Sequence, residues 1–400
     1  MTLAERKRGN ALALVIVAVD LGMMFVGAIM PTPLYPLFRA AFGFSGVMLT
    51  LIYAVYVLGN LAALLVFGRL ADQIGRRSVS VPAIGVGMAS ALAFAFAAST
   101  PWLFVARALS GFSTGLAAGT ATAWIAELYP GRGTGAASRI AAAANFFGCA
   151  VGPLGAGLLA QFAPAPLRLS FFVYLALLCF TLVAIFLAPE TVANPKRSLA
   201  DVSLTPRLGV PQSIRLQFVA PAVAAFAAFA LIGFYAALVP SLLRDSLHLS
   251  APAIAGGIVC ELFLVAAVTI LSSGRLESRA TMLTSLVLLV PSLWLLIAAE
   301  IFQSLPVLLI AAAGTGVSGG LGYRGSLEVI NRIAPSDQRA EVVSSYLVVC
   351  FAGNSLPVIG IGVLAALAGS LIADVSFAGV ITALAAVALW TGIKYAPKAL

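Results

Sequence analysis

Twelve apolar stretches of about twenty residues each recur along the chain, and they constrain its fold more than any other feature. An α-helix rises 1.5 Å per residue, so about 20 apolar residues cross the hydrocarbon core of a bilayer. The stretches are too continuous for membrane-barrel strands, which alternate over about ten residues. We therefore predict an all-α membrane protein with twelve transmembrane helices. Their ranges are 11–33, 46–67, 78–98, 101–125, 138–162, 167–188, 216–240, 251–272, 280–299, 304–325, 340–364 and 371–394.

The scarcity of charge supports the same prediction. Only 9% of the residues are charged and 62% are hydrophobic, whereas soluble domains carry about a quarter charged residues. The alternative of a large soluble core would require charged outer faces, which this sequence lacks. The net charge of +9 does not indicate a nucleic-acid partner, because the basic residues lie in short connectors between apolar stretches.

The distribution of lysine and arginine predicts the orientation. With both chain ends on one side, nineteen basic residues fall on that side and only Arg39, Arg168 and Arg244 on the other. Cytoplasmic connectors collect lysine and arginine. We therefore expect a multi-pass protein of the inner (plasma) membrane with both termini in the cytoplasm. No small-residue cleavage site interrupts the first apolar run, so we interpret it as a retained span.

The two halves of the sequence resemble each other at an offset near 205 residues. Gly68-Arg69-Leu70 recurs as Gly274-Arg275-Leu276. Six helices return the chain to its starting side, so the halves repeat in parallel orientation. The longest polar stretch lies between them. We predict an N-terminal six-helix bundle over 1–190, a cytoplasmic linker over 191–215 and a C-terminal six-helix bundle over 216–400.

The connector between the second and third helices carries the most specific motif, the run from Gly68 to Arg77, GRLADQIGRR. Gly68 and Gly75 permit tight turns, Asp72 can accept from helix N-terminal amides, and Arg76 can pair with a carboxylate. The run closely resembles the loop signature of the major facilitator superfamily. The resemblance implies the fold of that family and a loop that latches the two halves, together with an acid that ends the fourth helix, here Glu127. The alternative is a solvated basic loop that only sets topology.

Arg107 lies inside the fourth predicted helix. It precedes Gly111 and Gly115 by four and eight residues, which is similar to the family's fourth-helix signature. A charge in mid-span costs about 2.5–3.5 kcal/mol and persists where it faces a cavity or a partner. We nominate Arg107 for proton coupling; a structural or snorkelling arginine is the alternative.

The fifth predicted helix is rich in small residues. It resembles the glycine-proline signature of the exporter branches, which are often proton-driven antiporters, although Ala156 interrupts the double glycine that normally closes that pattern. Ordinary close packing of helices at small residues is the alternative reading. The residues concerned are Gly148, Gly152, Pro153, Gly155 and Gly157.

Two acids, Asp20 and Glu261, lie deep within apolar stretches. A lone carboxyl in apolar surroundings favours its neutral form, and it can exchange a proton when water reaches it. We therefore predict that one or both couple transport to protons. A structural, hydrogen-bonded acid is the alternative for each.

Helices 1, 4, 7 and 10 line the central cavity in the family, so the resemblance nominates residues on those helices here. Asn145 and Asn354, on the fifth and eleventh helices, are polar groups in apolar runs, which could equally form interhelical hydrogen bonds. The predicted substrate cavity consists of Met24, Thr114, Asn145, Tyr235, Thr315, Tyr323 and Asn354.

The sequence lacks the residue patterns that nucleotide binding, enzymatic catalysis and metal binding require. There is no phosphate-cradling loop for a nucleotide and no convergent set of nucleophile, base and orienting group. His248 is the single histidine, and the four cysteines lie in apolar stretches without metal-ligand spacing. We expect neither an enzyme nor a cofactor or metal site.

We therefore predict a secondary transporter that works by alternating access, as a monomer in the lipid bilayer, on a small-molecule substrate and protons. Proton-coupled efflux of a small organic compound or drug is the preferred function. A proton-linked importer of a small metabolite and a non-transporting receptor or scaffold are the alternatives. Costly intramembrane charges argue against the last one.

Overall fold

The computed structural model describes residues 3–129, 134–193, 195–196 and 208–396. In this part of the chain there is no strand, and twelve long helices account for most of the residues. Each overlaps one of the predicted ranges. They are α1 (Leu3–Ile29), α3 (Gly46–Phe67), α5 (Arg76–Ala95), α6 (Thr100–Leu128), α7 (Thr134–Phe162), α8 (Leu169–Ile185), α9 (Arg215–Asp245), α10 (Pro252–Ser272), α11 (Ser278–Ile301), α12 (Leu305–Ile333), α13 (Arg339–Ala368) and α14 (Ser370–Tyr395).

Ten helical segments among the described residues are long and apolar enough to cross a membrane. Two of the long helices are not among them. α8 is apolar but has only 17 residues. α6 is long enough, with 29 residues, but it is more polar because it carries Arg107 and several hydroxyl side chains.

Short helices link the long ones at several points that sequence reasoning missed. After α1 the chain forms the 3-10 turn η1 (Thr32–Leu34) and then α2 (Tyr35–Phe42). Pro33 and Pro36 stand in the first turns of these elements, where a missing amide hydrogen breaks no helical bond. The remaining short elements are α4 (Leu70–Ile74), η3 (Gln212–Ile214) and η4 (Ser273–Arg275).

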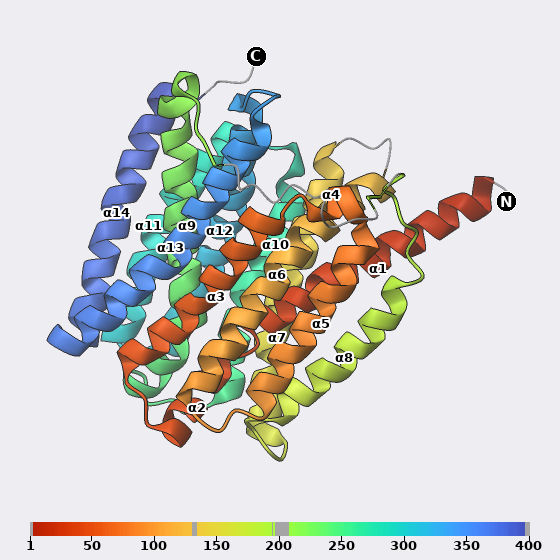
Figure 1. Ribbon diagram of the computed structural model, residues 1–400. Helices are drawn as coiled ribbons and strands as arrows, with labels where there is room; N and C mark the ends of the chain where they lie inside the picture. The colour runs from red at the N-terminus through yellow and green to blue at the C-terminus, as the bar shows by residue number, and fades with distance from the viewer. Residues whose placement is uncertain (1–2, 130–133, 194, 197–207, 397–400) are drawn as a thin grey trace.

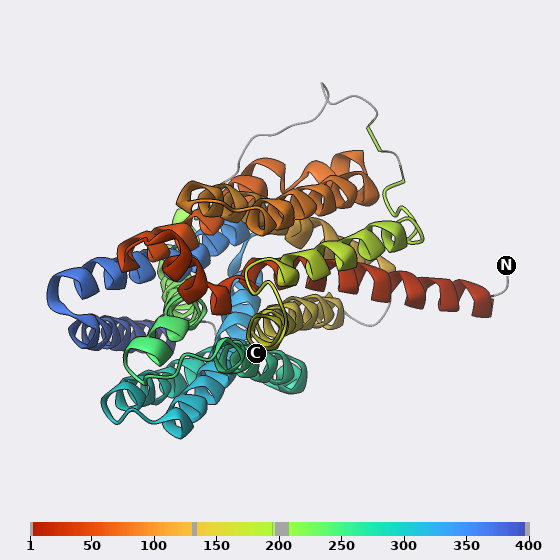
Figure 2. The same ribbon diagram turned by 90° about the horizontal axis from the view of Figure 1, so that it is seen from below.

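The helices run between two ends of the molecule (Figure 1). We call the end at which α1 begins, α14 ends and α4 lies the terminal face. The end that carries α2 is the opposite face. Seen from below (Figure 2), the helices of the first half of the chain lie mainly on one side and those of the second half on the other. The predicted boundary at 191–215 stays a prediction, and residues 194 and 197–207 of that segment lie outside the described residues.

Glycines bring helix backbones into direct contact at positions that repeat in the two halves. A Cβ at Gly111 of α6 would overlap the backbone oxygen of Tyr56 in α3. The counterpart of Gly111, 205 residues later, is Gly316 of α12, which lies in the same way on Leu262 of α10. The internal repeat seen in the sequence is therefore also a repeat of packing.

The same correspondence holds for two other helix pairs. Gly148 of α7 lies on the backbone oxygen of Gly22 in α1, and Gly353 of α13 lies on that of Phe226 in α9. No side chain fits between these backbones, so each pair of helices can approach only at glycine.

Two helix pairs join the first half of the chain to the second. α7 packs on α10, where a Cβ at Gly157 would overlap the backbone oxygen of Pro252. α3 packs on α13, where a Cβ at Gly362 would lie 2.6 Å from the hydroxyl oxygen of Thr50. These contacts lie toward the opposite face.

Alanine substitution tests whether the repeated glycines hold the fold. Alanine favours a helix over glycine by about 1 kcal/mol, so Gly85→Ala in α5, where a Cβ meets no atom within 4 Å, should leave or raise the thermal unfolding midpoint in detergent. Gly111→Ala should lower it, because the methyl group must push α6 away from α3. Equal midpoints for the two variants would contradict the packing argument.

Candidate functional site

Arg107 is almost completely buried, with 1% of its surface exposed. Its Nη1 donates to the backbone oxygen of Ala28 at 2.6 Å. Its guanidinium carbon lies 4.6 Å from the ring centre of Tyr56 and 5.4 Å from that of Tyr53. Such cation–π contacts contribute about 2 kcal/mol where water is excluded. They offset part of the cost of burying the charge.

The arginine also belongs to a connection between the two halves of the chain. The hydroxyl of Tyr53, whose ring lies under Arg107, donates to Oδ1 of Asn354 at 3.1 Å. Tyr53 lies on α3 and Asn354 on α13, so this buried bond joins helices from different halves. A movement that separates α3 from α13 must break it.

Asp20 is equally buried, with 1% exposed, but its environment differs. Neither carboxyl oxygen has a hydrogen-bond partner among the described residues. Arg107 does not pair with it, because Arg107 contacts α1 at Ala28, eight residues and about 12 Å farther along the helix. Asp20 is a lone acid in an apolar environment.

The face of α1 that carries Asp20 contacts helices of the first half. The sulfur of Met24 accepts from the hydroxyl of Ser113 on α6 at 3.3 Å. A Cβ at Gly27 would overlap the hydroxyl of Tyr174 on α8. Thr114 donates to the backbone oxygen of Ser110 within α6.

The second-half candidates lie on α9, α10 and α12. Glu261 is partly buried, and its Oε2 has no partner among the described residues. Tyr235 is fully buried, and its hydroxyl likewise has none there. Thr315 donates to the backbone oxygen of Ala311 in its own helix. No ion pair joins Arg107 to Asp20 or Glu261 in the described part of the chain.

Aromatic rings fill the interior around Tyr323. Its ring lies 5.8 Å from that of Phe146 on α7 and 5.9 Å from that of Phe229 on α9. Phe146 also approaches Phe263, and Phe229 approaches Phe351. Helices from both halves thus meet at this cluster.

None of the seven predicted cavity residues lines the cavity of about 370 Å³ that opens at the opposite face. Asn145, the predicted cavity residue not yet described, accepts a hydrogen bond from the thiol of Cys149 at 3.6 Å. It is next in sequence to Phe146 of the aromatic cluster.

At the terminal face, the structure brings the predicted loop residues together. Arg76 donates to both carboxyl oxygens of Glu127, at 2.6 and 3.2 Å, and its Nη1 lies 2.5 Å from Asp72. Gly75 connects α4 to α5 at φ +106°, a conformation that favours glycine. Gly68 follows the last residue of α3.

Sequence reasoning missed the acid that caps α5. Glu190 accepts from the backbone amides of Arg76 and Arg77 at 2.9 and 3.0 Å, so it fills the role expected of Asp72. A carboxylate at a helix N-terminus is stabilised by the amides and the helix dipole. The pairing spans more than a hundred residues, and the sequence alone does not indicate it.

The glycine-rich helix α7 uses most of its predicted residues for packing. Gly148 and Gly152 lie on α1, while Pro153 and Gly157 lie on α10. A Cβ at Gly155 would meet no atom within 4 Å.

Three further buried charges were not predicted as site residues. Arg324 donates to the backbone oxygens of Ser273 and Leu276 and pairs with Glu328 at 3.1 Å, so it holds the loop between α10 and α11. The other two, Glu300 and Asp374, are only 7% and 6% exposed near the opposite face. Glu300 and Asp374 lie near the ends of α11 and α14, whereas Arg324 lies within α12.

The ion pairs of Arg76 give a stability prediction. The Arg76 side chain is 6% exposed, that of Glu127 is 37% exposed and that of Asp72 is 56% exposed. Glu127→Gln should therefore lower the free energy of unfolding by roughly 1–3 kcal/mol, and Asp72→Asn by less than about 1 kcal/mol. Unfolding in detergent measures both, and the reverse order would contradict the assignment of Glu127 as the principal partner.

Comparison of the sequence and the structure with known proteins identifies the family of this chain. The family model described as Major Facilitator Superfamily matches residues 12–279, more than half of the chain. A crystal structure described as a bacterial homolog to the human lysosomal transporter Spinster, inward-facing and unoccupied, superposes with a TM-score of 0.76 at 16% identity. The match covers 98% of this chain and 99% of that one, and at this identity it shows the fold. The chain therefore belongs to the Major Facilitator Superfamily of membrane transport proteins.

Proposed function

We propose that this transport protein exports a small organic compound in exchange for protons, by alternating access. The proposal is carried by one observation: Asp20 is buried in α1, and neither of its carboxyl oxygens has a partner among the described residues. Glu261 on α10 supports it, since one of its carboxyl oxygens is also buried without a described partner.

The chemistry follows from the cost of burying charge. An ionised carboxylate without a partner is unfavourable in an apolar interior, so the acid takes up a proton there. When the halves open and water reaches the group, the charged form is solvated and the proton can leave. An acid exposed alternately to the two sides therefore carries protons down their gradient and can drive a second solute.

Arg107 has a different role in this proposal. It contacts the aromatic rings of Tyr53 and Tyr56, and it reaches Asn354 through Tyr53. A fixed cation at this position stabilises the contact between α3 and α13 and favours approach of electron-rich groups. We propose that it couples the state of the first half to that of the second.

We also propose that the ion pairs of Arg76 with Glu127 and Asp72 stabilise one of the two states, as the resemblance implies for the loop. The monomeric state, the inner-membrane location and the cytoplasmic position of the terminal face belong to the same proposal. The excess of basic residues at that face supports the orientation.

Import of a small metabolite is the second candidate, because the same fold and the same buried acids serve either direction. The exporter-like glycines of α7 favour efflux. A receptor or scaffold that does not transport would need neither the lone Asp20 nor the buried Arg107, each of which carries an energetic cost.

Vesicles that contain the purified protein and a pH-sensitive dye test the proposal. A panel of small organic compounds is added outside, and the internal pH is recorded. Antiport and symport move protons in opposite directions relative to the compound. Asp20→Asn should reduce proton movement by at least about tenfold, and Glu261→Gln should weaken it, because neither amide can carry a proton.

Asp337→Asn is the matched control, since Asp337 is an exposed acid outside the long helices and should transport as the parent does. The coupling role is wrong if Asp20→Asn and Glu261→Gln both keep gradient-driven transport.

A further inference from the structure

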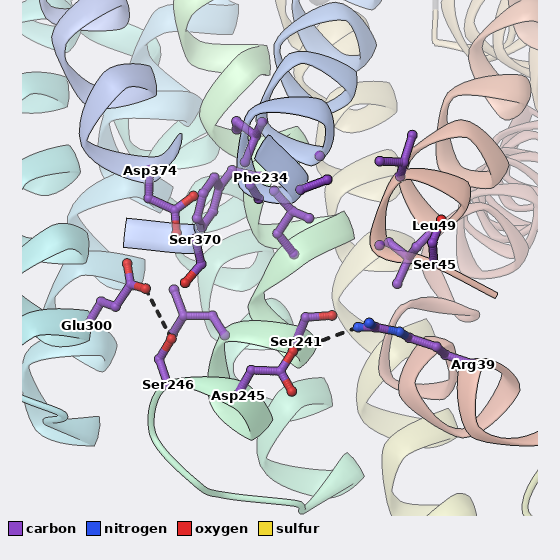
Figure 3. Close-up of a pocket in the computed structure, with 18 residues that line it drawn as sticks. Arg39, Ser45, Leu49, Phe234, Ser241, Asp245, Ser246, Glu300, Ser370 and Asp374 are labelled. Carbon is purple, nitrogen blue, oxygen red and sulfur yellow. Dashed lines mark hydrogen bonds and ion pairs between the residues drawn. The ribbon is translucent and has the colours of Figure 1, made fainter. Parts of the chain in front are cut away.

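A cavity of about 370 Å³ opens at the opposite face (Figure 3), and neither Asp20 nor Glu261 is among the residues that line it. The ends of α2 and α3 form one side of it, and α9, α11, α13 and α14 form the rest. Pockets of about 300–1,000 Å³ suit small molecules. The cavity is therefore large enough for a compact organic ligand.

Two carboxyl groups form one end of the cavity. Glu300 of α11 and Asp374 of α14 are 7% and 6% exposed, and both line the cavity. Figure 3 shows both on the same side of the cavity. Oε1 of Glu300 accepts from the hydroxyl of Ser246 at 3.0 Å, whereas its Oε2 is buried with no partner among the described residues.

The nearby basic residues do not neutralise this pair. Arg39 is the only basic residue among those described that line the cavity, and it lies 3.8 Å from Asp245. Arg244 also pairs with Asp245, at 2.9 Å. The acidic pair is thus left without a cation from the described part of the chain.

Apolar side chains line much of the rest of the cavity. Phe234 and Leu238 of α9, Leu49 of α3 and Ile361 of α13 line it. The ring of Phe234 is held in place by stacking on Phe377, with 5.5 Å between the ring centres. Phe234 is fully buried, whereas Leu238 is partly exposed and can contact the apolar part of a ligand.

We propose that this cavity binds an organic cation, with its charged nitrogen at Glu300 and Asp374 and its apolar part on Leu238 and Ile361. The two acidic side chains favour a positively charged ligand, and no basic side chain among the described residues pairs with them. The site goes beyond the proton-coupled efflux proposed above, because equilibrium binding requires neither proton coupling nor a direction of transport.

Equilibrium dialysis of benzyltrimethylammonium against the purified full-length protein in detergent tests the proposal. Binding should be saturable in the parent. Glu300→Gln with Asp374→Asn should weaken it by at least about tenfold, because the amides offer no negative charge. Asp337→Asn, which removes an exposed acid elsewhere, should bind as the parent does. Neopentylbenzene, the neutral isostere, should not displace the cation.

A second variant keeps the test decisive if the double variant does not fold. Ala366 lines the cavity and is exposed, so Ala366→Trp fills the space without disturbing the core and should also weaken binding by at least about tenfold. Three results would overturn the proposal. They are the absence of saturable binding in the parent, undiminished binding in the folded double variant or in Ala366→Trp, and equal affinity for the neutral isostere. Asp20→Asn should leave this binding intact, which separates the site from the proton-coupling proposal.

Discussion

Direct contact between helix backbones at glycine is the constraint on which the rest of the structure depends. In a membrane the hydrophobic effect does not drive helices together, so association depends on close packing and on the few buried polar groups. Gly111 on Tyr56 and Gly316 on Leu262 provide that packing at equivalent places in the two halves. The packing therefore repeats in the two halves, and similar glycine contacts also join α7 to α10 between them.

The buried polar groups then divide into two kinds. Arg76 has carboxylate partners that account for its burial. Arg107 contacts aromatic rings and donates to one carbonyl, but its Nε and Nη2 have no hydrogen-bond partner among the described residues. Asp20 has no partner among the described residues. A satisfied charge stabilises one conformation, whereas an unsatisfied acid gains when water reaches it. Charged groups with partners are suited to stabilising one conformation of the transporter. An acid without a partner is suited to promoting the change to another conformation.

The sequence predicts the helices well because each apolar run must cross the bilayer whatever it packs against. The ends are less predictable, since lipid does not define them. α12 continues to Ile333, eight residues past its predicted end, and the Arg324–Glu328 ion pair lies across that predicted end. The short helices α2 and α4 were missed because each is shorter than any membrane span.

The candidate site was only partly predictable. Arg76 and Glu127 meet as the resemblance to the family implies, but the cap of α5 comes from Glu190, which the motif does not include. Glu300 and Asp374 line one cavity because α11 packs beside α14, which no spacing in the sequence encodes. Partners distant in sequence are fixed by tertiary packing, and only the structure reveals them.

Our central proposal is that transport by alternating access requires α3 and α13, which pack together between the two halves, to separate at the opposite face. A Cβ at Gly362 would lie 3.2 Å from the Cβ of Thr50, close enough for a disulfide after a small adjustment. The most direct measurement is proton flux in vesicles by a Thr50→Cys, Gly362→Cys variant that lacks the four native cysteines. Our account predicts no flux while the disulfide is closed and recovery when it is reduced. If the protein with the disulfide intact moved protons as fast as the protein with the disulfide reduced, that result would contradict the account.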